Sequence, residues 1–118
     1  MSNIDRTNRE IAALIGETIS AKKGLSVILI DISEKSSFAD FFVVATATNE
    51  RQLASFADEV EGALEPDGIF VKNIEGKPSS GWILMDYGDV VVNLFLEETR
   101  GLYNLEKIWR DGEITEIE

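Results

Sequence analysis

Two apolar runs joined by a short polar turn constrain the fold of this chain more than any other feature of its sequence. Residues 82–85 and 90–96 are long enough for strands and rich in valine, isoleucine and leucine. Residues 86–89 supply the turn, because Gly88 can adopt a positive φ without a Cβ clash. Two apolar strands tied this closely predict the centre of a β-sheet. Residues 103–109 place apolar side chains at near-helical spacing, so we expect a short helix there that packs onto the sheet.

The preceding residues predict two amphipathic helices and three further strands. A first helix at about 5–23 would end in a C-terminal cap at Gly24. A second helix would begin at Asn49, three residues before Gln52, and would end at Pro66. The strands are expected at residues 25–32, 38–46 and 69–74, the last of them near a sheet edge.

This order of elements predicts an α/β (α+β) fold, with helices packed against one mixed sheet. The strand at 25–32 is apolar on both faces, which predicts a sheet covered on both sides. A loop is expected to open at Glu75-Gly76. A chain of 118 residues fits one domain, residues 1–118, with one core. We expect its acidic end, residues 111–118, to be a frayed tail.

Composition excludes several classes of chemistry. Histidine and cysteine are both absent, which removes Ser-His triads, Cys-His dyads and most zinc sites. Eleven basic and 22 acidic residues give a net charge of −11, which repels free nucleic acid and steers a basic protein partner toward the chain. The alternative explanation of the net negative charge is that it only keeps the protein soluble. No apolar run reaches the roughly 20 residues of a membrane helix, and no signal segment stands at the start, so we expect a cytoplasmic protein.

Several motifs give the sequence a resemblance to a known family. The apolar hairpin reads Trp-x-Leu-x-Asp-Tyr-Gly-Asp-Val over residues 82–90, and Glu-Glu-x-Arg follows at 97–100. Tyr-x-Leu-Glu-x-Ile-Trp then occupies residues 103–109. These motifs resemble those of the ribosomal silencing factor family, the Iojap-like proteins. Three positions depart from that family's pattern: Ala47 stands where the family usually has glycine, Asn49 where it usually has serine, and Asn93 where it generally has histidine.

The resemblance implies both a fold and a function. It implies a nucleotidyltransferase-like fold with a five-stranded mixed sheet and flanking helices. It also implies a translational repressor that binds the large ribosomal subunit through its fourteenth protein and blocks association with the small subunit. Homologues in mitochondria and chloroplasts act instead in assembly of the large subunit, and that role is the alternative.

A magnesium-dependent nucleotidyltransferase is a further alternative, which the residues favour less. Such an enzyme needs a Gly-Ser loop for the triphosphate and clustered carboxylates for two metal ions. Ala47-Thr48 occupies the loop position, and the chain has no Asp-x-Asp. We therefore expect no enzyme activity, no cofactor and no metal ion. The sequence also leaves the oligomeric state undecided, and a homo-oligomer such as a homodimer is a further alternative.

The candidate binding residues surround Trp82. Alternation along a strand places Trp82, Leu84 and Asp86 on one face, beside a loop rich in glycine, proline and serine. Tryptophan supplies a large rigid contact area at interfaces, although a tryptophan in a small domain is more often part of the core. An apolar anchor ringed by acids suits a basic protein surface. The predicted supporting acids are Glu75, Asp89, Glu97 and Glu98.

Overall fold

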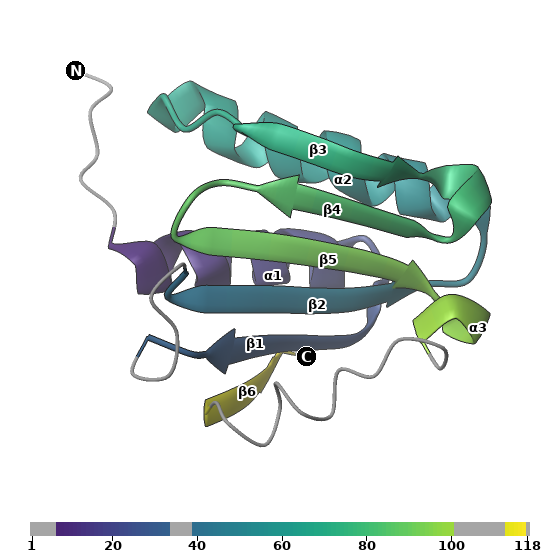
Figure 1. Cartoon of the computed structure of the whole chain (residues 1–118), viewed down its shortest axis with the longest axis horizontal. Helices are drawn as coiled ribbons and strands as arrows, with labels where there is room; N and C mark the ends of the chain where they lie inside the picture. Colours follow the sequence, from purple (N-terminus) through teal and green to yellow (C-terminus); the bar gives the residue numbers. More distant parts are fainter. Residues whose placement is uncertain (1–6, 34–38, 101–112, 118) are drawn as a thin grey trace.

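The computed structural model describes residues 7–33, 39–100 and 113–117, which form a mixed sheet with two long helices on one face. The helices are α1 (Asn8–Ala21), α2 (Glu50–Leu64) and the short α3 (Glu97–Arg100), with 3-10 turns η1 (Glu65–Asp67) and η2 (Pro78–Ser80). The strands are β1 (Leu25–Asp31), β2 (Phe41–Ala47), β3 (Asn73–Lys77), β4 (Trp82–Asp86), β5 (Val90–Leu96) and β6 (Glu113–Ile117). The strand order across the sheet is β3-β4-β5-β2-β1-β6 (Figure 1).

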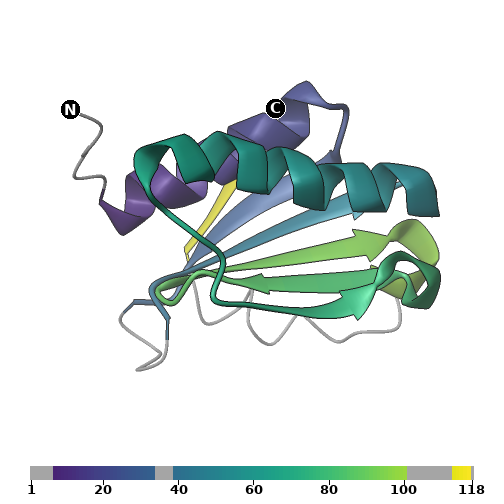
Figure 2. The same cartoon turned by 90° about the horizontal axis from the view of Figure 1, so that it is seen from above.

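The sheet is mixed because one neighbouring pair of strands is parallel. β2 and β5 run parallel at the centre, while every other neighbouring pair is antiparallel. Figure 2 shows α1 and α2 side by side over the same face of the sheet. The predicted class, a mixed sheet with flanking helices, is confirmed.

The main core lies between the two helices and the sheet. α1 contributes Ile15 and Ile19, α2 contributes Phe56 and Leu64, and the sheet contributes side chains that alternate with outward ones, such as Met85. Apolar side chains of the opposite sheet face form a second buried cluster, which includes Ile30, Phe42, Val44 and Phe95. Burial on both faces agrees with the apolar pattern of β1.

Both long helices begin at residues that cap them. Thr7 and Glu10 form a capping box at the start of α1. The side chain of Asn49 accepts a hydrogen bond from the backbone N–H of Gln52, 2.8 Å away, which confirms the predicted start of α2. The end of α1 differs from the prediction, because Lys23, not Gly24, adopts the positive φ of 71°. Gly24 is still needed, since a Cβ there would collide with the side chain of Ile19.

The edge strand β3 lies later in the chain than predicted. The expected strand at 69–74 is wrong for residues 69–72, and the expected loop at Glu75-Gly76 is part of β3. Ile69 and Val71 are apolar because they pack against the main core as the chain returns from η1. Every residue of β3 is exposed, so its sequence carries no burial pattern that could reveal a strand.

The acidic end of the chain also differs from its prediction as a frayed tail. Residues 113–117 form β6, which pairs antiparallel with β1 over Val27–Asp31 and adds a sixth strand to the expected five. Backbone pairing along the edge of β1 outweighs the acidic composition of the segment. The predicted helix at 103–109 lies outside the described residues. Among the described helices, none is long and apolar enough to span a membrane.

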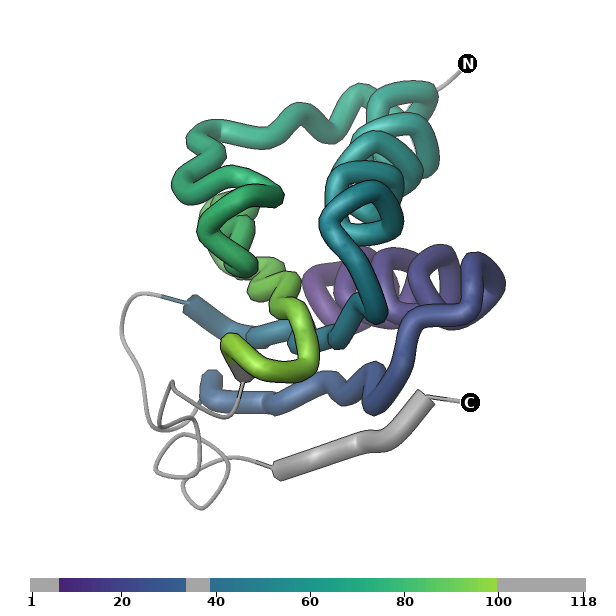
Figure 3. The backbone as a smooth tube through the Cα atoms, turned by 90° about the vertical axis from the view of Figure 1, so that its right-hand side faces the viewer, coloured from purple at the N-terminus to yellow at the C-terminus, as the bar shows by residue number. Residues whose placement is uncertain are grey.

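The hairpin that organises the fold is found as predicted. β4 and β5 pair antiparallel, with Trp82 opposite Phe95 and Asp86 opposite Val91. Figure 3 views the molecule from the side on which β5 runs into α3. The backbone N–H of Leu96 donates to the carbonyl of Gly81 at 3.0 Å, so α3 begins beside the start of β4.

Candidate functional site

β4 presents three of the predicted site residues on one face of the sheet. Trp82, Leu84 and Asp86 alternate with the buried Ile83 and Met85, which face the helices. The three alternating side chains are partly exposed. They therefore form a row along β4 on the face opposite α1 and α2, as strand alternation predicts.

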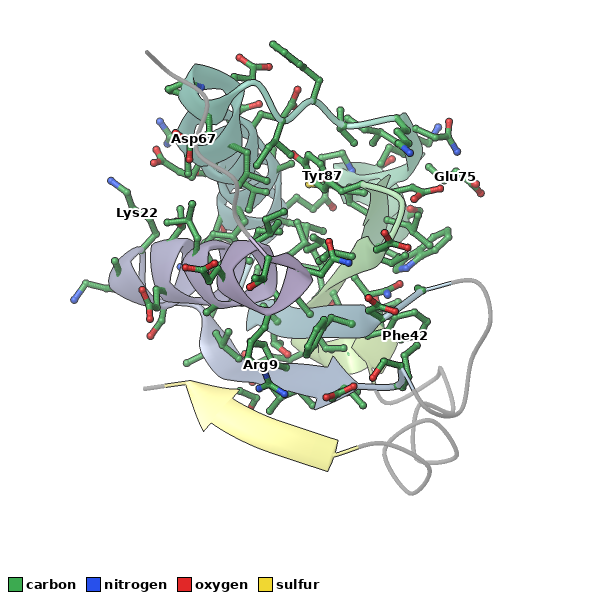
Figure 4. The ribbon with its side chains drawn as sticks, turned by 90° about the vertical axis from the view of Figure 1, so that its left-hand side faces the viewer. Arg9, Lys22, Phe42, Asp67, Glu75 and Tyr87 are labelled. Carbon is green, nitrogen blue, oxygen red and sulfur yellow. The ribbon has the colours of Figure 1, made fainter. Side chains whose placement is uncertain are left out.

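The neighbouring strand β3 adds one predicted acid and one unexpected base to this row. Glu75 lies directly opposite Leu84, and Lys77 lies directly opposite Trp82. Figure 4 shows Glu75 projecting on the side of the sheet away from the helices. We call Glu75, Lys77, Trp82, Leu84 and Asp86 the tryptophan face. Sequence reasoning missed Lys77 because β3 had been placed too early in the chain.

The other predicted acids lie at the two ends of this face. Asp89 is exposed in the turn between β4 and β5, and its backbone carbonyl accepts hydrogen bonds from the N–H groups of Asp40 (2.7 Å) and Phe41 (3.0 Å). Glu97 and Glu98 are exposed in the first turn of α3, beside the Trp82 end of β4. The fold thus brings Glu75 into the face itself and places the remaining three acids at its margins.

Asp86 has a structural role as well as a place in the face. Its Oδ1 accepts a hydrogen bond of 2.7 Å from the backbone N–H of Gly88 and so closes the turn after β4. The next residue, Tyr87, packs against the main core on the helix side, and burial raises the pKa of its hydroxyl, with Glu61 and Glu65 adding to the shift. Figure 4 shows Tyr87 at this end of the hairpin.

The indole of Trp82 is held by a residue that sequence reasoning noted but did not pair with it. Nε1 of Trp82 donates a hydrogen bond to Oδ1 of Asn93, 3.2 Å away on β5. Asn93 is only 7% exposed and interrupts a strand whose other residues are apolar. The signal for a partner was present, because a buried amide must find a hydrogen bond. The partner itself depends on strand register, which places Asn93 diagonally across from Trp82.

The other edge of the same indole lies against β3. A Cβ on Gly76 would come within 3.0 Å of Cε3 of Trp82, so Gly76 makes room for the six-membered ring. The indole is therefore bracketed between Gly76 on one side and Asn93 on the other. This arrangement gives the partly exposed tryptophan a defined orientation.

The loop before α2, which a nucleotidyltransferase would use for phosphate, is engaged in capping. The side-chain oxygen Oε1 of Gln52 accepts from the backbone N–H of Thr48 (2.8 Å) and from its hydroxyl (3.0 Å). Asn49 in turn accepts from the backbone N–H of Gln52. The donors of Thr48 are therefore engaged by Gln52, the residue whose own N–H is capped by Asn49 at the start of α2.

Asp31 at the end of β1 forms a turn with Ser33. Its Oδ1 accepts from the hydroxyl (2.7 Å) and the backbone N–H (3.0 Å) of Ser33. Its Oδ2 forms an ion pair with Arg9 of α1 at 3.0 Å. The two Ser33 donors, with Arg9 adding to them, hold the pKa of Asp31 below its usual value.

Comparison with known proteins supports the resemblance seen in the motifs. A family described as "Ribosomal silencing factor during starvation" matches residues 5–118. The chain is 35% identical over 112 residues to the ribosomal silencing factor RsfS of Halalkalibacterium halodurans, which covers 95% of this chain and 96% of that protein. A crystal structure of a protein from Chromobacterium violaceum superposes with a TM-score of 0.83 at 32% identity, covering 92% of this chain and 90% of that one.

A more distant relative is found in an animal. The mouse protein named "Mitochondrial assembly of ribosomal large subunit protein 1" is 31% identical over 87 residues. The match covers 70% of this chain and 38% of the mouse protein.

Proposed function

Because this chain belongs to the ribosomal silencing factor family, we propose that it binds the large ribosomal subunit with its tryptophan face and blocks association with the small subunit. The docking partner is a basic ribosomal protein, the fourteenth of the large subunit by the family resemblance. The action is steric, since a protein seated on the joining face of one subunit excludes the other. Translation is repressed without any chemical step.

The observation that carries this proposal is the row of Trp82, Leu84 and Asp86 on one face, with Glu75 beside it. A tryptophan and a leucine supply an apolar centre that can be desolvated, and tryptophan is among the residues that contribute most to interface free energy. Carboxylates at the edge favour a partner rich in lysine and arginine. Lys77 at the Trp82 end makes the face asymmetric in charge, which favours one docking orientation.

The net charge of the chain supports the same type of partner. A charge of −11 steers a basic surface toward the chain before contact is made and speeds association. Such steering is screened over a Debye length of about 8 Å at physiological salt. Binding should therefore weaken as salt is raised, while the apolar contact through Trp82 remains.

Cosedimentation with purified large subunits tests the proposal directly. Trp82→Glu should remove binding while the circular dichroism spectrum stays native, although the melting temperature should fall because Trp82 packs partly against the second apolar cluster. Phe70→Glu is the matched control, because Phe70 is also an exposed aromatic (62%) but lies outside the tryptophan face. Loss of binding in the Phe70 variant together with normal binding in the Trp82 variant would place the site elsewhere.

A second measurement separates silencing from the assembly role that the mouse relative's name suggests. A silencing protein should reduce the yield of whole ribosomes when mature large and small subunits are mixed, and Trp82→Glu should restore that yield. An assembly factor should bind immature large subunits in preference to mature ones. Sedimentation of the chain alone measures whether it is a monomer or a homodimer before it meets the subunit.

A further inference from the structure

We propose that Asn93 is a positioning residue for partner binding, which fixes the indole of Trp82 in its docking orientation. The inference rests on the proposed function of the tryptophan face. It assigns a role to a side chain inside the sheet that is only 7% exposed and that acts through Trp82.

The surroundings of Asn93 show that the fold itself gains little from an amide at this position. On β5 it lies between Val92 and Leu94, and its register partners are Leu84 on β4 and Val44 on β2. An apolar side chain of similar size suits such neighbours, whereas burying an amide is unfavourable unless it is hydrogen-bonded. The hydrogen bond from the indole of Trp82 satisfies its side-chain oxygen.

The indole gains a fixed orientation from the same bond. A partly exposed tryptophan can turn its N–H toward water, so the bond to Asn93 is not needed to satisfy that donor. Its effect is to hold the N–H edge toward β5 while the opposite edge, at Cε3, lies against Gly76. The ring is thereby held before the partner arrives, and the partner does not bear the entropic cost of ordering it.

Asparagine performs this task without dependence on pH. Its side-chain oxygen accepts a hydrogen bond at any pH in the physiological range. A neutral histidine can also accept through one ring nitrogen, but a protonated histidine carries donors on both nitrogens and cannot accept from an indole N–H. The chain has no histidine, so wild-type binding through this pair should not change between pH 8 and pH 5.5.

Three variants test the inference through affinity for purified large subunits at fixed salt. Asn93→Leu should fold with a melting temperature near that of the wild type and bind about threefold to tenfold more weakly, the effect of losing one pre-ordered side chain. Trp82→Phe should show at least as large a loss, because it removes the N–H donor together with part of the apolar contact area. The double variant should lose little more than Trp82→Phe alone, because the bond that Asn93→Leu breaks is already absent.

Asn93→His supplies the readout that a purely structural role would not give. Relative to the wild type on the same subunits, its binding should be close to normal at pH 8 and should weaken toward pH 5.5. Three results would each overturn the positioning role. The first is normal binding by Asn93→Leu, and the second is additive losses of affinity in the double variant. The third is a pH profile of binding by Asn93→His that equals that of the wild type. If Asn93→Leu does not fold, the Trp82→Phe and Asn93→His measurements decide the question by themselves. If Trp82→Glu also binds normally, the proposed docking face is wrong, and that failure is distinct from a failure of Asn93 alone.

Discussion

Gly76 and Trp82 touch across the β3–β4 pair so closely that a side chain on Gly76 would collide with the backbone carbonyl and the ring of Trp82. Gly76 also has a φ of +82°, a region in which side chains are strained. A glycine in the middle of the edge strand is therefore a requirement of the tryptophan face and not a weakness of the strand. The absence of a side chain at Gly76 leaves room for the ring of Trp82.

Gly76→Ala should lower the free energy of unfolding by more than about 1–2 kcal/mol, the cost of a left-handed conformation alone, because the collision with Trp82 adds to it. It should also weaken binding to the large subunit. Gly68→Ala is a matched control, since Gly68 has a similar φ of +79° and open space where its Cβ would lie. Urea unfolding and cosedimentation of the two variants measure both effects. Equal losses in the two variants would show that the contact with Trp82 is unimportant.

The start of α2 is the clearest case in which sequence predicted a local interaction. Asn49 and Gln52 have the spacing of a helix cap, and the structure contains the bond between them. Asn49→Ala should lower the free energy of unfolding by about 1 kcal/mol, because the N–H of Gln52 loses its acceptor. Asn49→Asp should retain the stability, since aspartate caps equally well and favours the positive end of the helix dipole. Thermal unfolding that does not distinguish the alanine from the aspartate variant would contradict this role.

Other parts of the fold were not accessible to the same reasoning. Two of the five residues of β6, Glu113 and Glu116, are acidic, and the strand that β6 pairs with, β1, lies far away in sequence. Every residue of β3 is exposed, so the strand has no alternation of apolar and polar residues from which it could be predicted. Ile69 and Val71 are apolar and were therefore assigned to a strand, but they lie in the connection before β3 and pack against the main core. Local patterns predict caps, turns and buried strands, but they do not predict which exposed segment supplies an edge.

In the candidate site too, some features follow from local sequence patterns and others depend on strand pairing. Alternation alone was enough to place Trp82, Leu84 and Asp86 together. The role of Asn93 could not be predicted, because its bond to Trp82 depends on a diagonal relationship that only the register of β4 and β5 defines. Lys77 was missed for a similar reason, since its place opposite Trp82 follows from the pairing of β3.

Gly62 offers a stabilising substitution in α2. It lies on the exposed surface of the helix, and no atom lies within 4 Å of the position its Cβ would take. Gly62→Ala should raise the free energy of unfolding by about 0.5–1 kcal/mol, because alanine has less backbone freedom to lose on folding. Urea denaturation checks the change, and binding to the large subunit should not alter. A decrease in stability would show that the glycine relieves strain in the helix.

The hydrogen bonds from Ser33 to Asp31, with a smaller effect of Arg9, predict a pH-dependent contribution to stability. The pKa of Asp31 is lowered from its ordinary value of 3.8 in the folded chain, so the folded state binds this proton less tightly than the unfolded state. The stabilising effect of the charged Asp31 carboxylate is therefore complete above about pH 5 and is lost as the pH falls through the lowered pKa of the folded state. Asp31→Asn should reduce the free energy of unfolding by less than about 1 kcal/mol at pH 7, because Arg9 is largely exposed and still screened by solvent.

Urea unfolding at several pH values measures this contribution. The difference between the wild type and Asp31→Asn should be constant from pH 7 to pH 5 and should shrink below pH 4. A difference that grows toward low pH would mean that Asp31 destabilises the folded chain when charged.

The charges of the tryptophan face predict opposite effects from two neighbouring substitutions. Glu75 and Lys77 lie on the same face of β3, two residues apart, and both are exposed. If the partner surface is basic, Glu75→Lys should weaken binding by about twofold to fivefold at low salt, the usual effect of one charge at an interface rim, and Lys77→Glu should strengthen it. Both changes should act mainly on the association rate, which surface plasmon resonance on immobilised large subunits measures.

The salt dependence supplies the control for this pair. Screening should bring the two variants and the wild type together at high salt, because the apolar contact through Trp82 is common to all three. Variants that shift the affinity in the same direction would show that β3 contributes shape and not charge. A lasting difference at high salt would instead mean that one of the two side chains makes a direct, desolvated contact with the partner, and the docked position of the tryptophan face would then have to include β3 in its buried centre.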